Sequence, residues 1–156
     1  MKTEIERKFL VAADSWRTDV GAGELYEQGY ISCDPKKITV RVRLAGSRGF
    51  LTLKGPTEGI SRSEMEYEIP ADEAKYMLEH FCGDRIVSKT RYLLEANGLQ
   101  LEIDEFHGEN QGLILAEIEL ESEDQPLEKP DWLGEEVSHD PRYFNAALSL
   151  NPFTAW

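Results

Sequence analysis

Near its beginning the chain reads Glu4-Ile5-Glu6-Arg7-Lys8, and this short segment carries the strongest signal about the fold. Side chains alternate between the two faces of a β-strand, so a strand over Thr3–Val11 places Glu4, Glu6 and Lys8 on one face. Two carboxylates and an ammonium group are costly to bury unless they are paired. The face therefore belongs either to a solvated sheet or to the wall of a charged cavity.

The same one-sided charge pattern recurs along the chain. Alternation predicts further strands over Glu24–Cys33, Ile38–Leu44, Phe50–Lys54, Ser61–Ile69, Arg85–Ala96, Leu99–Phe106 and Leu113–Glu121. In most of them one face is apolar and the other carries like charges two residues apart, as with Arg41 and Arg43 or with Glu117 and Glu119. Such pairs lie about 6–7 Å apart along a strand, so they need opposite charges or ions nearby.

Short turns join most of these strands, and two helices are predicted. Asp34-Pro35-Lys36 and Asn97-Gly98 mark tight turns, and Asn-Gly is a strong hairpin signal. A helix is predicted from Pro70 through Cys82 and a second one from Asp140-Pro141 to about Leu150, whereas the acidic stretch Ser122–Glu136 is predicted to be a loop. The fold class is α+β but mainly β. About eight strands with hairpin connections indicate an antiparallel barrel or sandwich.

Two architectures fit this pattern. An open antiparallel sheet would pack its apolar face on helices and leave its charged face in solvent. However, cationic strands such as Ile38–Leu44 and anionic strands such as Leu113–Glu121 are segregated in this chain. A wide barrel with an ionic inner wall and an apolar outer surface uses that segregation better, because cations hold a polyanion and carboxylates hold metal.

Composition places the chain among globular proteins. Its 156 residues, 40% hydrophobic and 30% charged, suit one domain over residues 1–156. The net charge of −13 argues against nucleic-acid binding, which requires a basic surface. No apolar run is long enough to span a membrane and no hydrophobic signal core is present, so we expect a cytoplasmic protein with no membrane partner. Cys33 and Cys82 fit no metal or redox spacing and are expected to be reduced.

Several motifs together resemble one known family. Glu4-Ile5-Glu6-Arg7-Lys8 is similar to the ExExK signature of the CYTH superfamily, the triphosphate tunnel metalloenzymes. Further matching segments follow in order, namely Arg41-Val42-Arg43, Leu51-Thr52-Leu53-Lys54-Gly55, Ser61-Arg62-Ser63-Glu64-Met65-Glu66-Tyr67-Glu68, Lys89-Thr90-Arg91, Glu102-Ile103-Asp104-Glu105-Phe106 and Glu117-Ile118-Glu119. The resemblance covers nearly the whole chain and is greatest to the short bacterial members.

This resemblance implies an eight-stranded antiparallel tunnel that binds a triphosphate along its axis and uses Mg²⁺ or Mn²⁺. The side chains expected to bind phosphate are cationic: Lys8, Arg41, Arg43, Lys54, Lys89 and Arg91. The expected metal ligands are carboxylates: Glu4, Glu6, Glu102, Asp104, Glu117 and Glu119. Glu64 or Glu66 is expected to activate the attacking water, and the sequence does not rank the two. Tyr30 is a candidate proton relay, although packing explains it equally well.

The resemblance also leaves substrate alternatives. The favoured function is metal-dependent hydrolysis of inorganic triphosphate to pyrophosphate and phosphate, because no extra segment for an organic group is evident. A nucleoside or thiamine triphosphate hydrolase, or a class IV-type adenylate cyclase, is the alternative, and it requires a rim that recognises the organic group. A non-catalytic polyphosphate-binding module is a third option, and the complete acidic set argues against it. A homodimer is one option for the oligomeric state.

Overall fold

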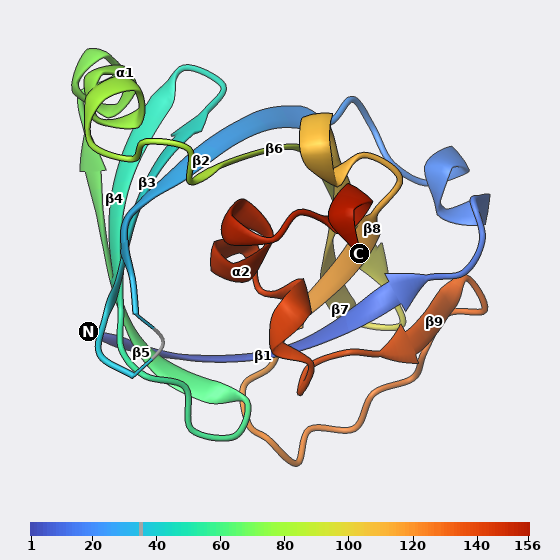
Figure 1. Cartoon of the computed structure of the whole chain (residues 1–156). Coiled ribbons are helices and arrows are strands. Elements are labelled where there is room, and N and C mark those ends of the chain that lie inside the picture. The colour runs from blue at the N-terminus through green and yellow to red at the C-terminus, as the bar shows by residue number, and fades with distance from the viewer. Residues whose placement is uncertain (35) are drawn as a thin grey trace.

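Eight antiparallel strands close into a barrel in the computed structural model, which describes residues 1–34 and 36–156 (Figure 1). The strands are β1 (Lys2–Val11), β2 (Glu24–Cys33), β3 (Thr39–Ala45), β4 (Arg48–Lys54), β5 (Ser61–Ile69), β6 (Ile86–Ala96), β7 (Leu99–Phe106) and β8 (Ile114–Glu119). They are hydrogen-bonded in the order β5-β4-β3-β2-β6-β7-β8-β1, and β1 also pairs with β5. This pairing closes the ring, so the predicted barrel is confirmed and the open sheet is not.

Strand and turn positions follow the sequence signals closely. The β6–β7 hairpin turns at Asn97 and Gly98, whose φ angles of 53° and 76° suit a turn with two left-handed residues. Helix α1 (Ala71–His80) begins directly after Pro70 and ends two residues before Cys82, with Asp72 and Glu73 in its first turn. The predicted turn at Asp34-Pro35-Lys36 includes Pro35, which lies outside the described residues. Within the described part of the chain, each helix is too short or too polar to cross a membrane.

One apolar core lies on the outer face of the barrel. Outward-facing residues of β1, β6, β7 and β8, among them Phe9, Leu101 and Ile118, are fully or nearly fully buried. They are covered by Trp16 from the 3₁₀ turn η1 (Ser15–Thr18) and by Trp132 from the segment before β9. On this side, the outer face of the barrel is therefore covered by other parts of the chain and is shielded from solvent.

A second apolar core corrects the expectation of a wholly ionic inner wall. Leu10, Val87, Phe106 and Leu115 each lie two positions from a charged inward-facing residue, so they share the inner face at one end of the barrel. Side chains of the C-terminal segment, including the fully buried Leu148, pack against them. This segment lies within the ring of strands (Figure 1). One end of the interior is thus apolar and filled by the chain's own C-terminal part.

Two element predictions near the C-terminus were wrong. The stretch Ser122–Glu136 was expected to be a loop, but its last residues form a ninth strand, β9 (Leu133–Glu136), which pairs with β1. The final helix is also interrupted. The 3₁₀ turn η3 (Pro141–Tyr143), capped by the Asp140 side chain, is separated by the extended residue Phe144 from α2 (Asn145–Leu150). Two more 3₁₀ turns, η2 (Gly108–Asn110) and η4 (Phe153–Ala155), complete the described elements.

Candidate functional site

The inner faces of the strands enclose a cavity of about 450 Å³. Its wall contains nearly all of the predicted site residues: Glu4, Glu6, Lys8, Tyr30, Arg41, Arg43, Lys54, Glu64, Glu66, Lys89, Arg91, Glu102, Glu117 and Glu119. The C-terminal segment contributes its inner surface through Phe144, Asn145 and Leu150. Asp104 does not line the cavity; it is fully buried behind it. Alternation in the sequence therefore predicted the convergence of charges correctly.

A row of three residues crosses β3, β4 and β5 and joins Arg41 to Glu66. Arg41, Thr52 and Glu66 are direct cross-strand neighbours. Arg41 Nη2 donates to both Thr52 Oγ1 and Glu66 Oε2 at 3.2 Å, and Thr52 Oγ1 donates to Glu66 Oε2 at 2.9 Å. Arg43 Nη2 reaches the same carboxylate oxygen at 3.3 Å. Burial opposes ionisation of Glu66, but these cations and Thr52 lower its pKa, so the carboxylate stays charged.

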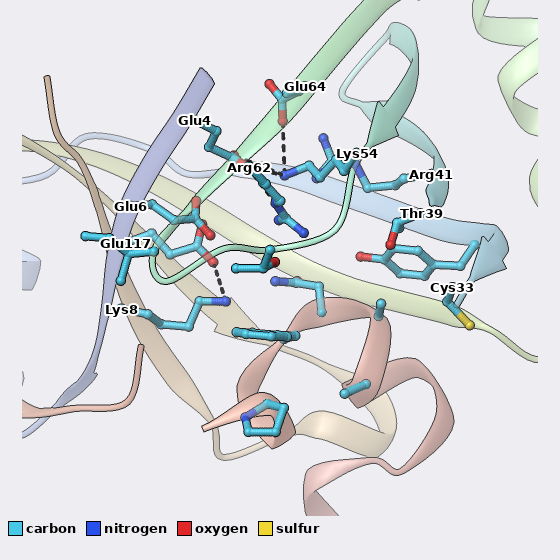
Figure 2. A pocket seen from close by; sticks show the side chains of 18 of the residues that line it. Glu4, Glu6, Lys8, Cys33, Thr39, Arg41, Lys54, Arg62, Glu64 and Glu117 are labelled. Atoms are coloured by element: carbon cyan, nitrogen blue, oxygen red, sulfur yellow. Dashed lines mark hydrogen bonds and ion pairs between the residues drawn. The ribbon is translucent and has the colours of Figure 1, made fainter. Parts of the chain in front are cut away.

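Glu4 is held by two cations. Lys54 Nζ donates to Glu4 Oε1 at 3.0 Å, and Arg62 Nε donates to Glu4 Oε2 at 2.9 Å. Lys54 also lies 3.0 Å from Glu64, so it bridges two carboxylates (Figure 2). Although burial alone raises the pKa of Glu4, the charges of Lys54 and Arg62 lower it to about 2.

A second group of ion pairs extends across β1, β8, β7 and β6. Lys8 Nζ lies 3.2 Å from Glu117 Oε1 and donates to the carbonyl of Tyr143. Arg91 contacts Asp104 with two nitrogens at 2.7 Å and Glu102 at 2.5 Å. Against the effect of burial, Lys8 and the neighbouring cations lower the pKa of Glu117 well below its usual range.

Lys89 is a buried ammonium at the junction with α2. Its Nζ donates to Asp104 Oδ2 at 2.6 Å and to Asn145 Oδ1 at 3.0 Å. Burial lowers the pKa of Lys89 to about 8, even though Asp104 favours the charged form. The C-terminal segment thus contacts two cavity cations, Lys8 through a carbonyl and Lys89 through Asn145.

Glu6 differs from the other carboxylates of the cavity. Among the described residues, it has no salt-bridge partner or side-chain hydrogen bond. Burial, together with the charges of Glu117 and Glu4, raises its pKa to about 7. A divalent cation beside Glu6 would relieve this repulsion.

The carboxylates fit a hard divalent cation in chemical type, because they supply oxygen ligands from β1, β7 and β8 around one cavity. In the described part of the chain no three acidic, histidine or cysteine side chains already converge into a ligand cluster. Most of the carboxylates are paired with cations instead. Binding of metal would therefore require Glu4 and Glu117 to exchange these partners.

Tyr30 is buried and its hydroxyl accepts a hydrogen bond from Gln28 Nε2 at 2.8 Å. Burial raises the pKa of Tyr30, which disfavours a phenolate. Gln28 Oε1 is buried without a hydrogen-bond partner in the described structure. The geometry is that of a packed phenol at the cavity wall.

Several residues of the site were not predicted from the sequence. Arg62 shares the inner face with Glu64 and Glu66, and this alternation could have identified it. Thr52 could have been found as the neutral inward residue two positions before Lys54. Alternation also places Tyr26 on the face of Tyr30, but a tyrosine in a strand is ordinary, and an asparagine in the first turn of a helix, such as Asn145, gives no signal either.

Comparisons with known proteins agree with this geometry. Residues 2–144 match the CYTH domain family. The chain is 49% identical over 153 residues to the inorganic triphosphatase of Acetivibrio thermocellus, covering 98% of this chain and 97% of that protein. It is 42% identical over 157 residues to the inorganic triphosphatase of Nitrosomonas europaea, covering 96% and 98% respectively.

Solved structures show the same fold. One described as an inorganic triphosphatase superposes with a TM-score of 0.69 at 37% identity and covers 96% of each chain. A protein from Pyrococcus horikoshii, only 19% identical, superposes with a TM-score of 0.61 over 78% of this chain and 80% of its own. At that identity the likeness concerns the fold alone.

Proposed function

Since the chain belongs to the CYTH domain family, we propose that it hydrolyses inorganic triphosphate to pyrophosphate and phosphate inside the barrel. The near full-length similarity to two inorganic triphosphatases supports this function. The observation that carries it is a cavity of about 450 Å³ whose wall brings six predicted phosphate-binding cations together with carboxylates. The enzyme is a phosphoanhydride hydrolase.

The cations bind the substrate and neutralise its charge. Arg41 and Arg43 offer planar guanidinium groups that suit two phosphate oxygens, while Lys8, Lys54 and Lys89 supply compact charges. Phosphoryl transfer depends on positioning and on charge neutralisation more than on covalent chemistry. We add Arg62 to the predicted set, because it lies on the same cavity wall and, among the described residues, forms an ion pair with Glu4 alone.

The acidic residues would hold Mg²⁺ or Mn²⁺. Glu6 is the first candidate because its carboxylate has no cation partner in the described structure, and Glu4, Glu117 and Glu119 line the cavity close by in sequence and register. Glu102 and Asp104 complete the predicted set, although Asp104 already serves Lys89 and Arg91. A bound divalent ion would neutralise phosphate oxygens and assist the activation of water.

Glu64 is the better candidate for orienting the attacking water. Glu66 accepts hydrogen bonds from Arg41, Arg43 and Thr52, all at Oε2, so its carboxylate is already tied to the cations expected to bind phosphate. Glu64 pairs with Lys54, a residue that a phosphate can recruit. We assign Tyr30 a packing role, because its raised pKa makes it a poor base.

Phosphate release from tripolyphosphate, pyrophosphate, ATP and thiamine triphosphate tests the proposal, each with Mg²⁺, Mn²⁺ or a chelator. Turnover of tripolyphosphate that requires a divalent ion and exceeds turnover of the other substrates is the expected result. Preference for ATP or thiamine triphosphate, or formation of cyclic AMP, would select the alternative enzyme classes. Binding without turnover in every metal condition would select a polyphosphate-binding module.

We also propose a cytoplasmic location, supported by Cys33 and Cys82, which form no disulfide. A homodimer stays a prediction. Met65 and Tyr67, on the outer face of β5, are more than one-third exposed and are available to a second copy.

A further inference from the structure

Tyr26 lies on the cavity wall between two arginines and belongs to an alternating series of cations and aromatic rings. Its ring centroid is 5.0 Å from Cζ of Arg43 and 5.1 Å from Cζ of Arg91. The two arginines come from β3 and β6, the strands that flank β2 on either side. The series continues on β4, where the Phe50 ring lies 5.3 Å from Arg43 and 5.0 Å from Arg48. All of these distances are within the range of cation–π attraction.

The two arginines that contact Tyr26 are held very differently by polar groups. Arg91 has Asp104 and Glu102 as close partners. Arg43 makes one side-chain hydrogen bond, to Glu66 at 3.3 Å, and its buried Nε–H has no partner in the described structure. Aromatic faces are therefore the main contacts that fix the Arg43 guanidinium.

The ring also lies between two like charges. Burial and the charge of Arg41 lower the pKa of Arg43, and Arg91 adds to this effect. Without the ring between them, mutual repulsion would push Arg43 and Arg91 apart or turn them toward the carboxylates. The aromatic ring attracts both guanidinium groups, which an aliphatic side chain such as leucine cannot do.

We propose that Tyr26 is a positioning residue for triphosphate binding: its ring holds the guanidinium group of Arg43, which lines the cavity, in the place where it can meet a phosphate. This inference rests on the proposed function for its ligand. This role differs from that of an aromatic platform on which a nucleobase would stack. Because guanidinium groups from both flanking strands contact the ring, it supports the cations that bind phosphate instead of an organic group.

Two substitutions of Tyr26 and one matched control test the proposal. Tyr26→Phe keeps the ring, so KM for tripolyphosphate should stay within about twofold of wild type. Tyr26→Leu removes it and should raise KM about five- to tenfold, with a much smaller change in kcat. Tyr67→Leu is the same change on the outer face, where Tyr67 is 54% exposed, and should leave KM unchanged. Thermal unfolding of each variant shows whether its fold is intact.

A readout without substrate separates this inference from the proposed function. In ¹⁵N-arginine NMR spectra, the Arg43 Nε–H resonance should be shifted by the ring current in wild type and in Tyr26→Phe, and should move in Tyr26→Leu. If wild type neither binds nor hydrolyses tripolyphosphate but this pattern holds, the proposed function fails and the placement of Arg43 by Tyr26 stands.

Three results would overturn the inference. The first is an Arg43 resonance that does not change in Tyr26→Leu. The second is a loss in Tyr26→Phe equal to that in Tyr26→Leu, which would assign the effect to the hydroxyl. The third is a rise in KM for ATP with none for tripolyphosphate, which would make Tyr26 a base platform. In an Arg43→Ala background, Tyr26→Leu should add less than about twofold to KM, since the residue it positions is gone.

Discussion

The ion pairs of Glu4 should make this residue a large, pH-dependent contributor to stability in the absence of metal. Its pKa is about 2 in the folded protein against an ordinary value of 4.5. A lowered carboxylate pKa stabilises the folded state above the unfolded pKa, and the contribution is lost as the pH falls toward the folded value. At about 1.4 kcal/mol per pKa unit, the charge of Glu4 contributes roughly 3 kcal/mol at pH 7 and roughly half of that at pH 3.

Glu4→Gln removes this charge but keeps the size of the side chain. We expect the variant to be less stable than wild type by about 3 kcal/mol at pH 7, and the difference to shrink to about 1.5 kcal/mol at pH 3. Urea unfolding followed by tryptophan fluorescence suits this measurement, because Trp16 and Trp132 are buried. A chelator must be present so that bound metal does not alter the pairs.

Glu68→Gln is the matched control. Glu68 pairs with Arg48 at 2.8 Å, but both side chains are more than half exposed, so solvent screens the pair and its loss should leave the stability nearly unchanged. A stability difference for Glu4→Gln that stays constant between pH 7 and pH 3 would refute the reasoning, because it could not come from ionisation. Equal stability of Glu4→Gln and wild type at pH 7 would mean that Lys54 and Arg62 do not hold this carboxylate.

Three further predictions concern other parts of the site. The pKa of Lys89 is lowered to about 8, so KM for tripolyphosphate should rise as the pH increases through that value; Lys89→Arg, which stays charged, should remove this rise in a KM–pH profile. Glu119→Ala should reduce Mg²⁺- or Mn²⁺-stimulated turnover at least tenfold, because Glu119 is an expected metal ligand. The midpoint of urea unfolding should stay nearly unchanged, because Glu119 pairs with Lys2 at the exposed rim. Unaltered metal dependence would remove Glu119 from the ligand set. Leu148 is fully buried where α2 enters the barrel, and Leu148→Ala should lower the free energy of unfolding by about 2–4 kcal/mol; a loss below 1 kcal/mol would show that α2 is not tightly packed there.

The sequence predicted the barrel and most of the cavity wall because both depend on a period of two residues. Once a strand is recognised, the position of Arg41 fixes the face of Arg43, and the same holds for Glu117 and Glu119. The segregation of positive and negative strands favoured a closed barrel over an open sheet, and the resemblance to the CYTH superfamily implied the eight-stranded tunnel. Asn97 shows that turn chemistry also acts locally, since its positive φ is the conformation that the hairpin requires.

What the sequence did not predict depends on contacts between distant segments. Leu10 and Leu115 lie on the same inner faces as the charged residues, although they are apolar. Their apolar character is explained by the C-terminal segment, which packs against them. Strand β9 lies in an acidic stretch after Pro130 with weak β-propensity, and its pairing with β1 outweighs that preference. The position of the Tyr26 ring between Arg43 and Arg91 could not be predicted either, because these side chains come from three different strands.

The docked segment from Pro141 to Leu150 has a consequence for how the protein is made. Biosynthesis proceeds from the N-terminus, so β1 emerges from the ribosome long before β8, its partner in closing the ring, and before the residues that wall off the apolar end. Until residues 141–150 have been made, the apolar inner face that includes Leu10 and Leu115 lacks the segment that covers it. Closure of this end therefore follows the synthesis of all nine described strands, so the interior of the barrel is completed late in folding.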